Sequence, residues 1–371
     1  MGGEEGSLGW CDVSELQPEF VDQWRDLFED SHSPNIYLSP DFILTALNTF
    51  CGDSPRVAWI GSEERLDALA VLEKQEWKLT FPASSYRLFK SIHSMQSGLL
   101  IRRGIEDANL DAFMRSLFEH SASSLYFEDF CPASETAKKI YESAQRQNLI
   151  WHETYRYDRA VLDTDISIEE WTASLRKKTR KEADRTRRRL QEIAPVSWRY
   201  VSATEVDDES IETFLRLEHQ SWKGDQGYSL LSDPKEVEFF RRIIRAFRLT
   251  DSVFFTELLL GEEVIASTVN FKAKDMAFAF KVASKKDLAK FAPGILNEMA
   301  FVQHMTENKL PFRLVDSGAT SGSYIEALWP GRMPMVSGYL LRGWRLRLIG
   351  SLLHVARQVK RVLSHYHGRL S

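Results

Sequence analysis

The stretch SVFFTELLLGEEVIASTVNFKAKDMAFAFKVAS, residues 252–284, decides the fold. It holds three runs rich in β-branched and aromatic residues, at 252–260, 264–273 and 276–284. Turns of only two or three residues separate these runs, and short turns between β-rich runs are typical of antiparallel neighbours in one sheet. We therefore predict a three-stranded antiparallel meander.

The segments on both sides of this meander complete a domain. After it, the basic loop KKDLAKFAPG (285–294) leads into a helix at 294–308, which strand-like FRLVDSG (312–318) and VSGYLLR (336–342) follow. Before it come a helical stretch at 168–191, a strand at 196–203, a helix with its apolar stripe at 211–217, and a helix opened by Pro234. This order of elements is that of the GNAT acyltransferase fold.

The N-terminal half repeats this pattern less clearly. Helical stretches at 18–30 and 39–50 come before three strand-like runs, VAWIG, LDALAVLE and WKLTF. After them come GLLIRRG, a helix at 108–120, strand-like SLYFEDF, a helix at 134–147 and strand-like WHETYRYDRAVL. We therefore predict an α/β (α+β) fold of tandem GNAT-like domains with mixed, mostly antiparallel central sheets flanked by helices. The expected parts are a degenerate domain at 1–163, a hinge at 163–167, an acetyltransferase domain at 164–342 and a helix at 343–371.

The composition narrows the class of protein. A net charge of −5 and a pI near 6.1 do not indicate a general binder of polyanions. Cys11, Cys51 and Cys131 are widely spaced and form no CxxC pair, which argues against a disulfide framework or a metal site and favours a reducing cytoplasm. No apolar run reaches the 18 or so residues of a membrane span. We therefore predict a cytoplasmic protein without a metal.

Four segments resemble those of the CelD/BcsL-type acetyltransferases, a GNAT branch linked with cellulose and exopolysaccharide biosynthesis and similar to the FemAB-type aminoacyltransferases. They are NIYLSPDFILTAL, SLRKKTRKEADRTRRRLQE, LEHQSWKGDQGYSLLSDP, and FAPGILNEMAF with the later FRLVDSG, SY and LWP. Members of that family often have Lys after the Tyr that corresponds to Tyr324, whereas this chain has Ile325. The resemblance covers most of the chain.

This resemblance implies an acyl-CoA-dependent N-acyltransferase. The acyl group, from acetyl-CoA or another acyl-CoA, would pass to an amine of a small molecule or of a lipid- or nucleotide-linked sugar, such as an amino sugar or an envelope or exopolysaccharide precursor. One alternative is an aminoacyl-tRNA-dependent ligase of FemAB type. Another is a non-catalytic GNAT-fold scaffold in polysaccharide biosynthesis.

The loop before the helix at 294 is the candidate cofactor site. A helix N-terminus offers unpaired N–H groups and the positive end of the helix dipole to a pyrophosphate, and Gly lets a phosphate approach the backbone closely. The lysines just before it can neutralise phosphate charge. The competing interpretation is a simple helix start with solvated lysines. The candidate residues are Lys285, Lys286, Lys290, Ala292, Pro293, Gly294 and Ile295.

Two further segments are candidates for binding the acceptor. In the basic helix, the resemblance implies that Lys178 and Arg180 hold a diphosphate; a solvated charged helix and a tRNA surface are the alternatives. In the Trp-Lys-Gly loop, Trp222, Lys223 and Gly224 are expected to border the acceptor pocket, whereas a core role for Trp222 is the alternative.

Four residues are candidate catalytic residues. His219 and Glu218 lie one helical turn before the Trp-Lys-Gly loop and are candidate bases. Tyr324 is the candidate donor of a proton to the leaving thiolate, and Asp316 the candidate that orients the amine. The competing interpretation gives Asp316 a capping role and packs Tyr324 on the sheet.

The tail at 343–371 combines leucines and valines with arginines and has no acidic residue. A basic amphipathic helix of this kind can lie on an anionic membrane surface. Peripheral association with the inner face of the membrane and packing across the two domains are therefore both open.

Overall fold

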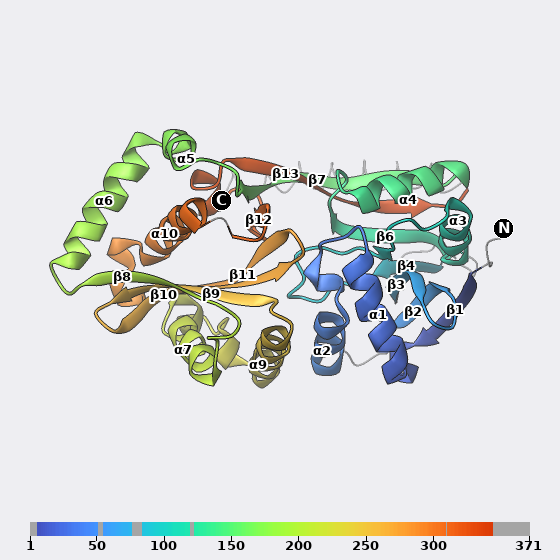
Figure 1. Cartoon of the computed structure of the whole chain (residues 1–371), viewed down its shortest axis with the longest axis horizontal. Coiled ribbons are helices and arrows are strands. Elements are labelled where there is room, and N and C mark those ends of the chain that lie inside the picture. Colours follow the sequence, from blue (N-terminus) through green and yellow to red (C-terminus); the bar gives the residue numbers. More distant parts are fainter. Residues whose placement is uncertain (1–5, 51–54, 76–83, 119–121, 309, 344–371) are drawn as a thin grey trace, which may run out of the picture. The chain divides into compact units, whose positions relative to one another are not determined.

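The computed structural model describes residues 6–50, 55–75, 84–118, 122–308 and 310–343. These residues form two compact units, each built from separated parts of the chain (Figure 1). Unit 1 takes the described residues up to 33, from 55 to 157 and from 334 onward; unit 2 takes 34–50 and the described residues of 158–333. The chain passes from one unit to the other inside strands β7 (Ile150–Asp163) and β13 (Gly331–Leu341).

Unit 2 is a mixed sheet in the order β7-β12-β11-β10-β9-β8, in which β12 and β11 are parallel and all other neighbours are antiparallel. The predicted meander is confirmed as β9, β10 and β11. Figure 1 shows α7 and α9 on one side of these strands and α10 on the other. The strands are β8 (Val196–Val201), β9 (Val253–Leu260), β10 (Glu263–Ala273), β11 (Met276–Ser284) and β12 (Leu314–Asp316).

The helices of unit 2 begin where the sequence places capping residues. Asp207 accepts a hydrogen bond from the Ser210 N–H at the start of α7, and Asp233 accepts one from the Lys235 N–H at the start of α9, with Pro234 in the first turn. The helices are α5 (Ile168–Ser174), α6 (Lys177–Gln191), α7 (Asp208–His219), α8 (Trp222–Asp225), α9 (Pro234–Leu249) and α10 (Pro293–Asn308), with 3₁₀ turns at Lys286–Phe291 and Tyr324–Ala327.

Two segments of unit 2 differ from the sequence expectation. The stretch predicted as one helix at 168–191 is two helices, because Leu175 is extended and buries its side chain in the same core as Trp171. Helix α2 (Pro40–Phe50) belongs to unit 2, whereas the sequence places it in a domain at 1–163. Its Phe42 ring packs against Phe239 and Phe271, with ring centroids 5.7 and 6.5 Å away.

Unit 1 repeats the connectivity of unit 2. In both units a three-stranded antiparallel meander is followed by a helix and a strand that pairs in parallel with the third strand of the meander. The sheet order is β1-β2-β3-β4-β6-β13, with β5 against β3. The elements are β1 (Ser7–Asp12), α1 (Pro18–Asp30), β2 (Arg56–Gly61), β3 (Leu66–Gln75), β4 (Ser84–Leu88), β5 (Leu100–Ile101), α3 (Asp107–Ser116), β6 (Ala122–Phe130) and α4 (Glu135–Arg146).

The run WKLTF of the first half lies outside the described residues, as do most of the residues of the predicted helix at 343–371. Among the described residues, no group of three or more His, Cys, Asp or Glu side chains is placed to hold a metal ion. None of their helices combines the length and the hydropathy of a membrane-spanning segment.

Candidate active site

Strand β11 leaves part of its edge without a neighbour. It pairs with β12 only over Met276–Phe278, and from Ala279 to Ser284 its β12-facing edge has no partner strand within the described ranges. The corresponding parallel pair of unit 1 behaves differently, because β4 pairs with β6 along nearly its whole length. Backbone groups on a free strand edge can bind a ligand. Unit 2 therefore has an opening at this position.

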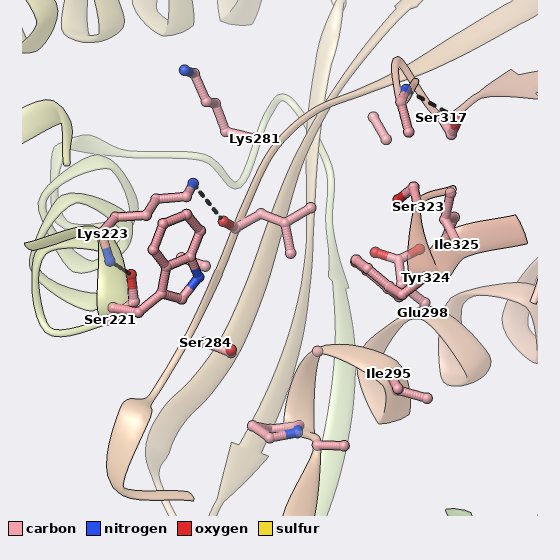
Figure 2. Close-up of a pocket in the computed structure, with 18 of the residues that line it drawn as sticks. Ser221, Lys223, Lys281, Ser284, Ile295, Glu298, Ser317, Ser323, Tyr324 and Ile325 are labelled. Carbon is pink, nitrogen blue, oxygen red and sulfur yellow. Dashed lines mark hydrogen bonds between the residues drawn. The ribbon is translucent and has the colours of Figure 1, made fainter. Parts of the chain in front are cut away.

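A cavity of about 500 Å³ lies at this opening. Its wall comes from the start of α8, the free part of β11, the start of α10 and the segment between β12 and β13 (Figure 2). Figure 2 shows Lys223 and Lys281 on one side of it and Glu298 and Tyr324 on the other. The lining residues used below are Trp222, Lys223, Lys281, Ser284, Ala292, Pro293, Gly294, Ile295, Glu298, Ser323 and Tyr324.

The first turn of α10 forms one end of the wall. Ala292 adopts a left-handed conformation (φ 47°, ψ 54°) that turns the chain into Pro293. The first N–H groups of a helix have no partner inside it and carry the positive end of the dipole. A Cβ added to Gly294 would meet nothing nearer than Ser284 Oγ at 3.9 Å, so the backbone is open here. This end of the cavity can hold an anion.

Glu298 is a buried carboxyl group in the cavity wall, one helical turn after Gly294. Its side chain is only 2% exposed, and burial raises its pKa from the usual 4.5 to about 7, although a hydrogen bond from Thr268 opposes this shift. Oε1 accepts that bond from Thr268 Oγ1 at 2.7 Å. A carboxyl group with this pKa can take up and release a proton at neutral pH.

A buried polar network fixes Thr268 and therefore Glu298. The side-chain amide of Asn297 donates to Thr268 Oγ1 at 3.2 Å and to the Thr256 carbonyl oxygen at 3.1 Å. Its Oδ1 accepts from Trp198 Nε1 at 2.9 Å. Because Thr268 Oγ1 accepts from Asn297, its own hydrogen is directed to Glu298. The network thus joins α10 to three strands behind the cavity.

Tyr324 lies across from the start of α10 on the segment after β12. Its side chain is 49% exposed, and desolvation together with the nearby carboxylate of Glu298 raises the pKa of its phenol. The phenol is therefore protonated at neutral pH and can donate a proton. Ile325 after it is buried in the same core as Trp329 and gives this segment an apolar anchor.

The Trp-Lys-Gly loop forms the wall on the α7 side. Trp222 is 58% exposed and is not a core residue. Lys223 Nζ donates to Glu218 Oε1 at 2.8 Å and to the Val282 carbonyl oxygen at 3.1 Å, which ties α8 to β11. Gly224 is not part of the cavity wall, and a Cβ there would come within 1.8 Å of the His219 carbonyl oxygen, so the tight corner requires glycine.

The two candidate bases of α7 lie outside the cavity wall. Glu218 is buried, and its second oxygen, Oε2, accepts from the Leu230 N–H at 2.8 Å, so both of its oxygens are occupied. His219 is exposed, and its Nδ1 lies 2.8 Å from Ser229 Oγ. Their geometry indicates that they hold the loop after α7 in place.

Asp316 also lies behind the wall rather than in it. It is fully buried, its Oδ2 accepts from Arg159 Nη1 at 3.2 Å, and its Oδ1 accepts from the Gly318 N–H at 2.8 Å. These bonds fix the chain where it leaves β12. Asp316 thus positions the segment that carries Tyr324.

The lysines of the candidate cofactor loop are engaged with the protein surface. Lys285 pairs with Glu263, and Lys286 pairs with Asp225. Lys290 Nζ lies 5.0 Å from the Phe291 ring centroid. None of the three lines the cavity. Ala289 and Ala292, the residues next to Lys290 in this loop, do line the cavity. The lysines therefore lie beside the cavity and not in its wall.

The basic helix α6 packs next to this loop. Its Ala183 and Leu190 are buried together with Phe291 and Leu296, and Arg189 lies over the Phe291 ring at 5.7 Å. Lys178 is exposed and Arg180 half-buried, and neither lines the cavity. The structure thus brings Trp222, Lys223, Tyr324 and the 292–295 segment together around one cavity and leaves α6 on its outside.

Two charged residues of the wall were not predicted from the sequence, Glu298 and Lys281. The signal for Glu298 was an acidic residue on a helix turn between Leu296 and Phe301, which are both buried. Lys281 interrupts the apolar run MAFAFKVAS in the same way. A charged residue inside a buried element is paired or functional more often than not.

Residues 177–324 match the sequence model of the family described as Acetyltransferase (GNAT) domain. No curated protein matches the chain by sequence. Among solved structures, the chain is similar to FemX, with 11% identity and a TM-score of 0.58 over 89% of this chain and 98% of that one. It is also similar to the C-terminal domain of a putative lysylphosphatidylglycerol synthetase from Agrobacterium fabrum (12%, TM-score 0.53, 92% and 95% covered) and to L-PGS from Bacillus licheniformis (11%, 0.51, 90% and 96%).

The predicted fold class is therefore confirmed: a mixed α/β fold with mostly antiparallel sheets flanked by helices and a GNAT-type acetyltransferase domain. The chain is a GNAT-fold acyltransferase. Every residue of the cavity wall lies within the matched segment or within a few residues of its end. At 11–12% identity, the similarity to the solved structures concerns the fold alone.

Proposed function

We propose that this chain is an acyl-CoA-dependent N-acyltransferase that transfers an acetyl or longer acyl group to an amine. The observation that carries this proposal is the cavity at the free edge of β11. It brings a helix N-terminus suited to an anion, a carboxyl group with a pKa of about 7 and a protonated phenol to one place. For the aminolysis of an acyl-CoA thioester, these features would hold the phosphates of the donor, deprotonate the amine and protonate the departing thiolate.

The residues present fit an acyl-CoA as the donor substrate. The pyrophosphate would bind the first turn of α10 at Pro293, Gly294 and Ile295, where the backbone is open. Lys290 would add positive charge beside this turn, whereas Lys285 and Lys286 would have to exchange Glu263 and Asp225 for the phosphates. The free backbone edge of β11 over 279–284 would hold the extended arm of the donor and polarise its thioester carbonyl.

The chemistry requires the nitrogen to lose two protons and the sulfur to gain one. Glu298 would accept the first proton of the acceptor ammonium, which frees the nitrogen lone pair. The nitrogen then attacks the thioester carbonyl carbon, and the new C–N bond forms. As the C–S bond breaks, Tyr324 would donate its proton to the departing thiolate and recover one from the nitrogen, which becomes the amide. The protein contributes position and proton transfer and forms no covalent bond with the substrate.

The acceptor side of the proposal rests on the loop at α8. The exposed Trp222 ring can stack on a sugar, which fits an amino sugar or a similar envelope precursor. The resemblance to the CelD/BcsL-type branch points to exopolysaccharide or cellulose biosynthesis as the setting. A cytoplasmic location and contact with the inner face of the membrane belong to the same proposal.

An aminoacyl-tRNA-dependent ligase is the second candidate. Two observations favour it: the fold is similar to that of FemX, and α6 exposes Lys178 and several other basic side chains, with Arg180 half-buried beside them. Within the part of the chain that the structure describes, Arg185 is the one basic residue of α6 in an ion pair, with Glu182 at 2.5 Å. Basic side chains at such density can bind a phosphate backbone.

Calorimetric titration with acetyl-CoA and longer acyl-CoAs tests the proposal, with Gly294→Trp and Gly294→Ala as a matched pair. A Trp side chain would fill the open space at the start of α10, whereas Ala would make only ordinary contact with Ser284. We expect binding by the wild type and by Gly294→Ala and none by Gly294→Trp. Absence of binding to any acyl-CoA, together with transfer from charged tRNA, would establish the second candidate. Binding of acyl-CoA without turnover of any amine would favour a scaffold.

A further inference from the structure

Lys281 lies on the face of the sheet opposite Glu298. In the β10–β11 pair, Thr268 is opposite Val282 and Val269 is opposite Lys281. Paired residues of antiparallel strands point to the same face, and successive residues point to opposite faces. Since Thr268 contacts Glu298 of α10, Lys281 points to the side of α7 and α8. This is the side on which Lys223 lines the cavity (Figure 2), together with Trp222 before it in α8.

The two lysines of this wall differ in their partners. Lys223 is held by Glu218 and by the Val282 carbonyl oxygen. Lys281 makes no ion pair with any residue that the structure describes, although Glu218 and Glu236 are close enough to act on its pKa. Both oxygens of the Glu218 carboxylate already accept a bond from another group, Lys223 Nζ and the Leu230 N–H. Its ammonium lies 5.6 Å from the Phe280 ring centroid.

A desolvated cation of this kind favours an anion. Burial lowers the pKa of Lys281, with Lys223 acting in the same direction, so the protein has already removed much of the water from this ammonium. An anionic ligand would restore the interaction energy lost with that water. The charge-assisted bond formed would be stronger than a neutral one.

The donor does not supply that anion. Ser284, which faces the start of α10, follows Lys281 by three residues on β11, or about 10 Å along the strand. Lys281 also points to the other face of the sheet. Lys281 is therefore directed away from a pyrophosphate at Gly294 and toward the molecule that would enter beside Trp222.

We propose that Lys281 binds an acidic group of the acceptor, so that the acceptor is an amine that also carries a carboxylate or a phosphate. This inference rests on the proposed acyltransferase function. The acceptor would enter beside Trp222, with its acid group on Lys281 and its amine directed to the free edge of β11, where the thioester carbonyl would lie. Trp222 would cover the part between them.

Three acceptors with one carbon skeleton test this inference. Ethanolamine, β-alanine and O-phosphoethanolamine share a two-carbon amine and end in a hydroxyl, a carboxylate and a phosphate. The release of CoA from acetyl-CoA gives kcat/KM for each, and calorimetry with and without CoA gives binding independent of turnover. The variants are Lys281→Met and, as a matched control, Lys235→Met, which removes an exposed lysine at the start of α9.

We expect at least one acid to exceed ethanolamine by roughly tenfold or more, as a charged hydrogen bond predicts. Lys281→Met should remove this preference, because it lowers kcat/KM for the favoured acid far more than for ethanolamine, and Lys235→Met should keep the preference. The better acid identifies the group as carboxylate or phosphate. Equal binding and use of all three by the wild type, or a preference that survives in Lys281→Met, would overturn the inference. Failure to bind acetyl-CoA would instead remove the proposed function itself.

Discussion

Thr268 Oγ1 donates to Glu298 Oε1 across 2.7 Å while the same oxygen accepts from Asn297 Nδ2 at 3.2 Å. These two bonds join strand β10 to the candidate base Glu298, and they point the hydroxyl hydrogen of Thr268 at its carboxyl group. Burial raises the pKa of Glu298, and the bond from Thr268 lowers it, so the value of about 7 is a balance of the two. A substitution of Glu298 removes the buried carboxyl group, and a substitution of Thr268 removes the hydrogen bond, so the two effects can be tested separately.

Replacing Glu298 with Gln should abolish turnover and stabilise the fold at alkaline pH. The carboxyl pKa is about 7 in the folded chain against 4.5 in the unfolded one, so the unfolded chain loses its proton first. The wild type therefore loses stability as the pH rises from 4.5 to 7, by up to about 3 kcal/mol. Urea unfolding at pH 4 and pH 8 measures this. The variant should match the wild type at pH 4 and exceed it at pH 8; equal stability at both would contradict the raised pKa.

Replacing Thr268 with Val should move the pH profile of kcat/KM. The wild-type rate should rise with a midpoint near pH 7, as Glu298 loses its proton. Without the hydrogen bond the pKa of Glu298 rises further, so the rising limb should shift to higher pH. Thr268→Ser keeps the donor and is the control. An unshifted limb in Thr268→Val would mean that another group is the base.

Gly224→Ala should destabilise the protein by about 1–3 kcal/mol, because the added methyl group would overlap the His219 carbonyl oxygen. Gly294→Ala is the matched change at an open position and should cost nothing in stability. Thermal unfolding of the two variants compares them. A Gly224→Ala variant as stable as the wild type but without activity would instead give Gly224 the acceptor-binding role expected from the sequence.

Arg159→Met should destabilise the fold by about 3–5 kcal/mol, because it leaves the Asp316 carboxylate buried without its cation. Adding Asp316→Asn should recover most of the loss, since Asn keeps an acceptor for the Gly318 N–H. Chemical unfolding and kcat per folded molecule are the two measurements. Asp316→Asn should lower stability and leave kcat unchanged; a large fall in kcat with normal stability would make Asp316 catalytic.

The sequence predicted the elements well wherever the pattern was local. The strand predicted at 276–284 is β11, and the helix predicted after Pro293 is α10. The β-rich runs and a capping Asp or a Pro at a helix start act over a few residues, so they can be read without the fold. The break at Leu175 could not be read, because it depends on where distant core residues leave room for that side chain.

The sequence predicted which segments form the site, but it did not predict which side chains from different segments come together there. The FAPG loop and Trp222 line the cavity, but Glu298 was hidden among apolar neighbours on α10. Glu298 lines the cavity because β11 pairs with β12 only over its first residues and leaves an opening beyond them. This pairing cannot be predicted from the local sequence. Conversely Glu218, His219 and Asp316 carry the residue types of a base, yet their hydrogen bonds occupy them elsewhere.

The membership of Phe42 in the core of unit 2 has a consequence for biosynthesis. This ring packs on Phe239, Phe247 and Phe271, which are made about two hundred residues later. During synthesis on the ribosome, the apolar face of α2 therefore stays exposed to solvent until these three phenylalanines have emerged. The nascent chain should accordingly be a client for chaperones over that interval, and gene fragments that start at residue 164 should yield insoluble protein.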